Sequence, residues 1–183
     1  MIILIGGESC TGKTKLAHDL MRAFNIPYLS IDIVMMGLYR SNSNCGYTPL
    51  DSSYQINKYV WPILSEMIKT NIENNTKYIY EGFQIQPNSI NQLEEKYRKN
   101  IFSLFLGFSA EYIEKNYAII QEKRSIIEKR NDVDSIEKMI ENNIRIKNEC
   151  EKENQIFYSI NKNYCNEINI LINMIRKIIR RSS

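Results

Sequence analysis

The sequence predicts an α/β fold with a parallel sheet, and three features of its pattern support this prediction. Short apolar runs alternate with longer stretches in which apolar residues recur at helical spacing. The two most apolar runs, 2–5 and 101–108, are apolar at nearly every position, as is typical of strands buried on both faces of a parallel sheet. The resulting order, β-α-β-α-β-α-β-α-(β)-α, is that of an α/β protein.

The first unit is a strand followed by a helix. The run at 2–5 is the first strand, and glycines end it immediately. Over 13–24, apolar residues that include Leu16 and Leu20 fall within about a third of the helical circumference. We therefore expect an amphipathic helix that packs one side against the sheet.

The second unit is less regular. A strand is expected at 28–31, ending at Asp32, and a polar, turn-rich stretch covers 41–49. Helical spacing returns over 56–67, with Pro62 inside the series. Because an interior proline costs a helix about 3 kcal/mol, we expect a kink or two abutting helices there.

The middle of the chain contains the next two strands. A third strand is expected at 77–81 and a fourth at 101–108, with a charged surface helix over 88–100 between them. Another helix is expected from about Ser109. It leads into a strongly charged segment at 122–134.

The last part of the chain returns to helical spacing. Apolar residues recur from Ile136 to Ile144, a weak fifth strand is possible at 156–160, and a terminal helix is marked by apolar residues over 168–178. Neither an internal repeat nor a linker interrupts the pattern. We therefore expect one domain over 1–183, with a helical lid segment at about 122–134.

Composition excludes several classes of protein. The chain is 43% hydrophobic and 25% charged, which is globular rather than disordered, and its net charge of +3 is too small to predict a nucleic-acid or membrane partner. Apolar runs stay short of the roughly 18 residues that span a bilayer. We expect a cytoplasmic protein. The scattered cysteines, which form no CxxC pair, favour neither a zinc site nor a disulfide scaffold: Cys10, Cys45, Cys150 and Cys165.

A phosphate-binding motif lies between the first strand and the first helix. It matches G-x-x-x-x-G-K-[ST] at every fixed position, with the residues Gly7, Glu8, Ser9, Cys10, Thr11, Gly12, Lys13 and Thr14. Backbone N–H groups of such a loop surround phosphate oxygens at the positive end of the following helix. We expect Lys13 to reach the β- and γ-phosphates and Thr14 to bind Mg²⁺, so ATP and Mg²⁺ are the predicted cofactors. The alternative is a glycine-rich turn that matches by chance.

A cysteine within this motif and a histidine shortly after it carry side chains of reactive types. Cys10 lies near the positive helix end, which would make it either a reactive thiol or a tolerated residue at a variable loop position. His18, the only histidine, points nearly opposite to Leu16 and Leu20. We interpret it as solvent-exposed and without a catalytic role.

Two acids follow expected strands at the edge where doubly wound sheets bind ligands. Asp32 ends the second strand and Glu81 the third. Phosphoryl transfer to an alcohol needs a group that accepts or orients the hydroxyl proton, and an ATP site needs an acid near Mg²⁺. We assign the first role to Asp32 and the second to Glu81. The alternatives are an N-cap for Asp32 and a turn or capping carboxylate for Glu81.

The motif and these two strand ends resemble the small P-loop kinases. The stretch from Ser30 to Val34 with Arg40 downstream, and Tyr80-Glu81-Gly82, resemble in particular 2-phosphoglycerate kinase and its relatives. The resemblance implies the P-loop NTPase fold, with a five-stranded parallel sheet in the order 2-3-1-4-5 and helices on both faces. It places Glu81 near the metal, and the predicted substrate contacts are Asp32, Arg40 and Gly82. Arg40 is equally well an exposed helical arginine.

A more distant resemblance is to adenylate kinases. Tyr80-Glu81-Gly82-Phe83 is similar to their Asp-Gly-Phe-Pro-Arg stretch, but Gln84 and Ile85 stand where Pro-Arg would be. That arginine normally grips the phosphate of the acceptor. Its absence argues against a nucleoside monophosphate as acceptor.

The charged segment stands where these kinases carry a mobile lid. It contains Lys123, Arg124, Lys129 and Arg130, and the predicted catalytic arginines are Arg124 and Arg130. Arginines on a closing lid can contact the transferring phosphoryl group. Arg145 further along also resembles the lid-flanking pattern of adenylate kinases. The alternative is a solvated helix surface with i,i+4 ion pairs, for example Glu141 with Arg145.

Two further groups of residues stay open between a structural and a functional role. The basic C-terminal end at 176–181 is explained by the helix dipole or, less simply, by nucleic-acid contact. Aromatic residues after Asp32 either line an acceptor pocket or belong to the core: Tyr39, Tyr47, Tyr54 and Trp61.

The sequence thus predicts an ATP- and Mg²⁺-dependent phosphotransferase that moves the γ-phosphate to a hydroxyl of a small-molecule acceptor. Lys13 and a lid arginine would stabilise the transferring group. Thr14 and Glu81 would hold the metal, directly or through water. The alternatives are a nucleoside monophosphate kinase and a non-catalytic nucleotide-binding module. Nucleic acid and membranes are not expected as partners.

Overall fold

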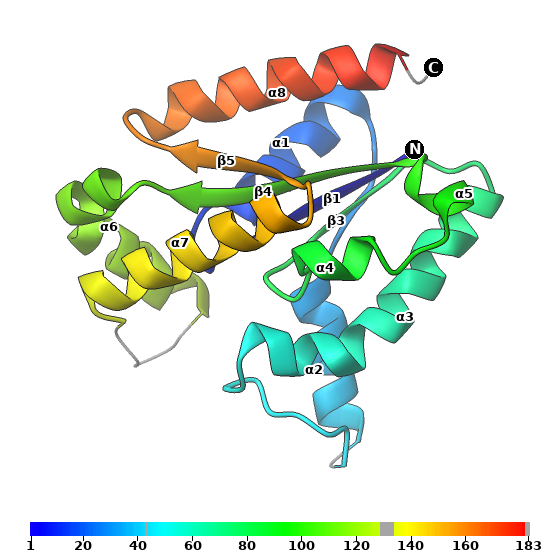
Figure 1. Cartoon of the computed structure of the whole chain (residues 1–183), viewed down its shortest axis with the longest axis horizontal. Helices are drawn as coiled ribbons and strands as arrows, with labels where there is room; N and C mark the ends of the chain where they lie inside the picture. The colour runs from blue at the N-terminus through cyan, green and yellow to red at the C-terminus, as the bar shows by residue number, and fades with distance from the viewer. Residues whose placement is uncertain (43, 129–133, 182–183) are drawn as a thin grey trace.

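The structure, a computed structural model, is built on a twisted parallel sheet (Figure 1). It describes residues 1–42, 44–128 and 134–181, without the side chains of 123–128 and 181. Within these residues five strands form one sheet in the order β2-β3-β1-β4-β5, and every neighbouring pair is parallel. The predicted strand order 2-3-1-4-5 is confirmed.

The strands match the apolar runs closely. They are β1 (Ile2–Gly7), β2 (Tyr28–Ser30), β3 (Tyr78–Glu81), β4 (Ile101–Phe108) and β5 (Ile156–Ile160). The second strand ends one residue earlier than predicted. Ile31 is fully buried and already begins the next helix, so Asp32 lies in a helix and not at a strand end. The prediction for Asp32 is wrong in that respect.

Helices connect the strands across both faces. They are α1 (Lys13–Phe24), α2 (Ile31–Ser41), α3 (Ser53–Glu73), α4 (Pro87–Ile90), α5 (Glu95–Arg98), α6 (Ala110–Glu128), α7 (Ile136–Lys152) and α8 (Tyr164–Arg181). Two differences from the predicted helices are informative. First, α3 continues through Pro62 without dividing into two helices.

The second difference lies between β3 and β4. The predicted charged helix over 88–100 is wrong, because the structure has the two one-turn helices α4 and α5 there. Ile90, Leu93 and Tyr97 are all buried. The segment is therefore a packed connection. Its turns bring apolar side chains into the core, whereas a single exposed helix would leave these side chains in water.

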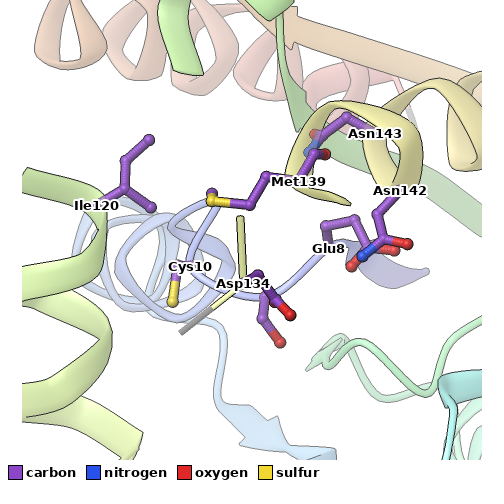
Figure 2. A pocket seen from close by; sticks show the side chains of 8 residues that line it. Glu8, Cys10, Ile120, Asp134, Met139, Asn142 and Asn143 are labelled. Carbon is purple, nitrogen blue, oxygen red and sulfur yellow. The ribbon is translucent and has the colours of Figure 1, made fainter. Parts of the chain in front are cut away.

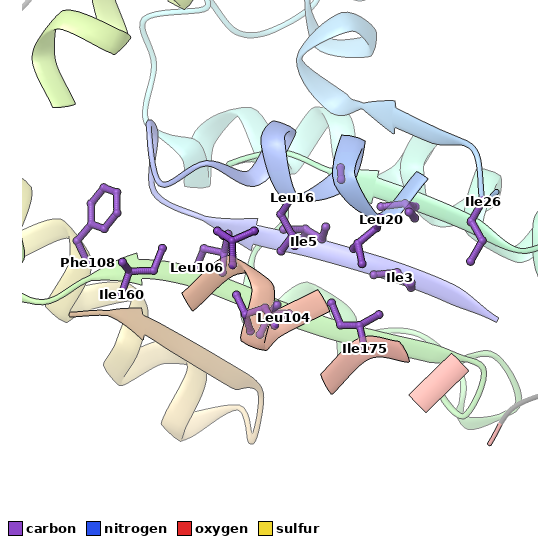
Figure 3. Close-up of a cluster of buried hydrophobic side chains, with 14 of the residues drawn as sticks. Ile3, Ile5, Leu16, Leu20, Ile26, Leu104, Leu106, Phe108, Ile160 and Ile175 are labelled. Atoms are coloured by element: carbon purple, nitrogen blue, oxygen red, sulfur yellow. The ribbon is translucent and has the colours of Figure 1, made fainter. Parts of the chain in front are cut away.

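The apolar residues of β1 divide between two cores, one on each face of the sheet. Ile3 and Ile5 join the cluster that α1 and α8 cover, which Figure 3 shows with Leu16, Leu20 and Ile175. Ile2 and Leu4 join the cluster on the other face, covered by α2, α3 and α7. Burial on both faces explains why the strand is apolar at every position.

None of the helices in the described part of the chain is both long enough and apolar enough to cross a membrane.

Candidate active site

The predicted phosphate loop joins β1 to α1 in the structure, as the motif requires. Three of its residues have positive φ: Gly7 at 117°, Cys10 at 62° and Gly12 at 87°. Glycine is needed at two of them for space as well. A Cβ on Gly7 would lie 2.1 Å from the carbonyl oxygen of Leu106, and one on Gly12 would lie 1.6 Å from the hydroxyl of Tyr164. The loop is therefore pressed between β4 and α8.

Lys13 is held inside this loop. Its side chain is only 7% exposed, and Nζ donates a 2.6 Å hydrogen bond to the backbone oxygen of Glu8. The hydroxyl of Thr11 donates to the same oxygen at 2.8 Å. These two bonds tie the two ends of the loop together. They also place the ammonium group where phosphate oxygens would approach the loop amides.

Thr14 and Glu81 meet at the end of the sheet where the strands have their carboxyl ends. The hydroxyl of Thr14 donates to Oε1 of Glu81 at 3.1 Å, although 67 positions separate them. The strand register explains the meeting, because Glu81 pairs with Ile5 on one side and with Ser30 on the other. Glu81 therefore stands beside the carboxyl end of β1, from which the loop departs.

The carboxyl group of Glu81 is 1% exposed. Burial raises its pKa, hydrogen bonds from Ser30 and Thr14 and the charge of Lys13 oppose that rise, and the nearby charge of Asp32 adds to it. The net direction is upward. A buried carboxylate next to a second acid needs a cation to stabilise its charged form.

These residues fit a magnesium ion. Mg²⁺ prefers oxygen ligands and is commonly held by one or two carboxylates together with water and substrate phosphates. The hydroxyl of Thr14 and the carboxylate of Glu81 supply such oxygens at one place, next to the loop that would hold the phosphates. When bound, the ion would neutralise charge on the phosphates.

Asp32 lies in the first turn of α2, next to Glu81. The cap of this helix is Ser30, so the alternative that Asp32 caps it is also wrong. Asp32 is half-buried, and Oδ1 accepts a 2.6 Å hydrogen bond from Nε2 of Gln84. Strand pairing between β2 and β3 explains why the start of α2 and the end of β3 are adjacent.

A basic residue from α7 reaches the phosphate loop. One nitrogen of Arg145, Nη2, lies 2.9 Å from Oε1 of Glu8, and the other, Nη1, lies 2.9 Å from Oε1 of Glu149. The alternative in which Arg145 pairs with Glu141 is wrong, since Glu141 pairs with Lys138 at 3.5 Å instead. Sequence reasoning noted Arg145 but did not place it at the site.

The predicted lid arginines cannot be placed by the described residues. The backbone of Arg124 belongs to α6, but its side chain lies outside the described part of the chain, and Arg130 lies outside it entirely. Their catalytic roles stay predictions.

Two neighbouring side chains prove to be packed. Cys10 is half-buried against the cluster under α1 and α8. The prediction that His18 is solvent-exposed is wrong, because the ring is half-buried and stands edge-on to Tyr28 at 6.3 Å between centroids.

The predicted acceptor side is partly core and partly surface. Tyr47 and Trp61 are 6% exposed and belong to the core, whereas Tyr54 is 56% exposed. Arg40 is exposed in the last turn of α2. Gly82 is buried, and a Cβ there would lie 2.4 Å from Oε1 of Gln84. Contacts of Arg40 and Gly82 with an acceptor stay predictions.

A small cavity lies where the phosphate loop faces α6 and α7. Its volume is about 20 Å³, and its lining includes Glu8, Cys10, Asp134 and Met139 (Figure 2). A cavity of this size holds about one water molecule. The cavity is therefore too small for a nucleotide.

Comparisons with known proteins agree with this geometry at the level of the fold. No protein-family model matches the chain, and no curated protein sequence matches it either. Solved structures do match. Shikimate kinase from Aquifex aeolicus superposes with a TM-score of 0.58 at 15% identity, covering 98% of each chain. The chain has the P-loop kinase fold.

Two further structures extend this P-loop kinase likeness. Shikimate kinase from Bacteroides thetaiotaomicron has a TM-score of 0.59 at 14% identity, again covering 98% of each chain. Deoxyadenosine kinase from M. mycoides has a TM-score of 0.57 at 11% identity, covering 97% of this chain and all of that one. The closer resemblance to 2-phosphoglycerate kinase stays a prediction.

Sequence reasoning missed residues that reach this candidate site from far along the chain. Tyr164 packs its hydroxyl against Gly12, and burial raises the pKa of that hydroxyl well above its ordinary value. Gln84 was noted only as a departure from the adenylate kinase pattern. No local motif marks either residue, because each acts through a contact that the fold creates.

Proposed function

We propose that the protein transfers the γ-phosphoryl group of ATP, with Mg²⁺, to a hydroxyl of a small-molecule acceptor. The observation that carries the proposal is the meeting of Thr14 and Glu81, 3.1 Å apart, next to the buried ammonium group of Lys13. A motif that matched by chance would not bring a distant buried acid to its threonine.

Each residue then has a defined part in the reaction. The loop amides and Lys13 bind the phosphate oxygens and stabilise the negative charge that grows in the transition state. Thr14 and Glu81 hold the metal. Asp32, at the start of α2, orients the acceptor hydroxyl and takes its proton as the oxygen attacks phosphorus. Arginines of the segment at 122–134 contact the transferring group and help to exclude water.

The test measures ADP formation from ATP and Mg²⁺ with two panels of acceptors. One contains hydroxyl compounds without phosphate, such as sugars, sugar acids and nucleosides, and the other contains nucleoside monophosphates. Turnover with a member of the first panel is the expected result. Turnover only with the second would indicate a nucleotide kinase, and ATP binding without any acceptor-dependent turnover would indicate a binding module.

The variant Asp32→Asn sharpens this test. Loss of a general base typically lowers turnover by about 10²- to 10⁴-fold, and ATP affinity should stay unchanged because Asp32 lies on the acceptor side. Retention of full turnover would contradict the role given to Asp32. Calorimetry with ATP and Mg²⁺ provides the binding measurement.

A further inference from the structure

The loop after β3 buries a polar side chain that no motif explains. Gln84 is 1% exposed, yet Nε2 donates to Oδ1 of Asp32 at 2.6 Å and also lies 3.2 Å from the sulfur of Met35. A buried amide in contact with the apolar core is unfavourable unless both of its ends are paired.

The two ends of this amide differ in their partners. Among the residues that the structure describes, none donates a hydrogen bond to Oε1 of Gln84, which is buried. Rotating the amide would not help, because an ionised carboxylate can only accept hydrogen bonds, so the NH₂ group must face Asp32. The unpaired oxygen is thus a consequence of the bond to Asp32.

The surrounding chain is arranged to hold the amide there. Gly82 leaves room for it, since a Cβ at position 82 would lie 2.4 Å from Oε1. The backbone oxygen of Gln84 accepts a 2.7 Å bond from Nδ2 of Asn57, which is itself 8% exposed. Oδ1 of Asn57 in turn accepts a 3.1 Å bond from the hydroxyl of the fully buried Ser89.

These bonds form a chain of polar contacts through three helices and one loop. It runs from α2 through the loop after β3 to α3 and α4, in the order Asp32, Gln84, Asn57, Ser89. A polar network in a core that lacks some of its hydrogen bonds lowers the stability of the fold. Such unfavourable arrangements persist at functional sites, where the position of a side chain matters more than the stability it costs.

We infer that Gln84 is the positioning residue for Asp32: its amide fixes Oδ1 so that Oδ2 faces the acceptor hydroxyl. This inference rests on the proposed function, in which Asp32 orients that hydroxyl. Gln84 does not touch the reacting atoms. It acts through Asp32, and its own burial is tolerated for that purpose.

The test uses Gln84→Met, which keeps the length of the side chain and removes both polar ends. Turnover with the active acceptor should fall at least about tenfold, because small displacements of a catalytic group have large effects on rate. The affinity for ATP should not change. The melting temperature should be equal or higher, because the unpaired oxygen is gone and Met35 gains an apolar neighbour.

A matched control is available in the same loop. Gln86 is 2% exposed and donates to the backbone oxygen of Phe83 at 2.8 Å, without touching Asp32. Gln86→Met should lower the melting temperature and leave turnover intact. A merely structural role for Gln84 would give the same pattern as Gln86 and would overturn the inference.

A double variant separates the two proposals. If Gln84 acts through Asp32, Gln84→Met should have no further effect on turnover in the Asp32→Asn protein. An equal loss in both backgrounds, or full turnover of Gln84→Met alone, would overturn the inference while leaving the role of Asp32 intact. Full turnover of Asp32→Asn, or no turnover with any acceptor, would overturn the proposed function and the inference with it.

Discussion

The phosphate side and the acceptor side of the site are built in different ways. On the phosphate side, eight consecutive residues form the loop, and distant parts of the chain contribute single contacts to it: Glu81 to Thr14, Arg145 to Glu8 and Tyr164 to Gly12. On the proposed acceptor side, four residues from three helices and one loop form a polar chain that starts at the half-buried Asp32 and continues through buried side chains.

This difference teaches where specificity can change. In the proposed function the loop would bind phosphates largely through backbone amides, so its chemistry would depend on local conformation and tolerate different residues at its variable positions. The acceptor side depends on hydrogen bonds between side chains, so each of these side chains must keep both its length and its polarity. We therefore expect substitutions on the phosphate side to affect any acceptor equally, and substitutions on the acceptor side to affect turnover without changing ATP binding.

On the phosphate side, the largest effect is expected at Lys13. Lys13→Met keeps the apolar stem and removes the ammonium group, which should lower turnover by about 10²- to 10³-fold with every acceptor. Lys15→Met is the matched control. Lys15 forms an exposed ion pair with Asp19 at 2.8 Å and should tolerate the change. Steady-state kinetics of both variants provide the measurement. Similar losses of turnover in the two variants would contradict the specific role given to Lys13.

A smaller effect is expected at Glu81, where pH and metal are linked. Burial raises the pKa of Glu81, so the carboxyl group takes up a proton at a higher pH than an exposed one. In the proposed function the protonated group would no longer bind Mg²⁺. Turnover at limiting Mg²⁺ should fall as the pH is lowered through this raised pKa. Glu81→Gln should weaken the apparent affinity for Mg²⁺ by about 10- to 100-fold, the range typical of groups that support a metal site.

The raised pKa of Glu81 predicts that low pH, which lowers turnover, favours the stability of the folded protein. A carboxyl group whose pKa is higher in the folded than in the unfolded protein favours folding at low pH, and this contribution is lost as the pH rises through the folded pKa. Glu81→Gln should therefore raise the melting temperature at pH 7 without nucleotide, and the gain should disappear below the ordinary carboxyl pKa. A lower melting temperature at pH 7 would contradict the assigned burial.

Two glycines provide a paired test of stability. Gly12→Ala should destabilise the protein by about 1–3 kcal/mol, because φ is +87° and the new Cβ would meet Tyr164. Gly37 lies inside α2, with nothing within 4 Å of an added Cβ, so Gly37→Ala should stabilise it by about 0.5–1 kcal/mol. Urea unfolding of both variants measures the difference. Equal shifts would mean that Gly12 is not pressed against α8.

The smallest effect is expected at Arg145. Its partner Glu8 places a negative charge in the phosphate loop, which Arg145 offsets through a partly exposed pair. Arg145→Ala should weaken ATP binding by an amount corresponding to about 0.2–1 kcal/mol. Adding Glu8→Gln should restore the affinity, because the unpaired charge is then removed. Calorimetry checks both, and failure of the second change to restore binding would show that Arg145 contacts the nucleotide directly.

The sequence alone determined the parts that depend on neighbouring residues. The apolar runs marked β1 and β4 clearly, because a strand buried on both faces must be apolar at successive positions. The edge strand β5, which is only partly buried, gave a weaker signal. The loop at 7–14 was evident because its conformation needs Gly7 and Gly12 at a fixed spacing. Acids near the ends of β2 and β3 were found because the carboxyl ends of parallel strands share one edge of the sheet.

Tertiary structure alone decided which distant side chains reach the site. Strand pairing places Glu81 against Thr14, and the packing of α7 and α8 brings Arg145 and Tyr164 to the loop. The burial of Gln84 beside Asp32 follows from the turn at Gly82 and from a bond to α3. Such contacts join residues that are tens of positions apart. Their energies depend on burial and on interatomic distance, and neither of these quantities is specified by the type of a residue or by its spacing along the chain.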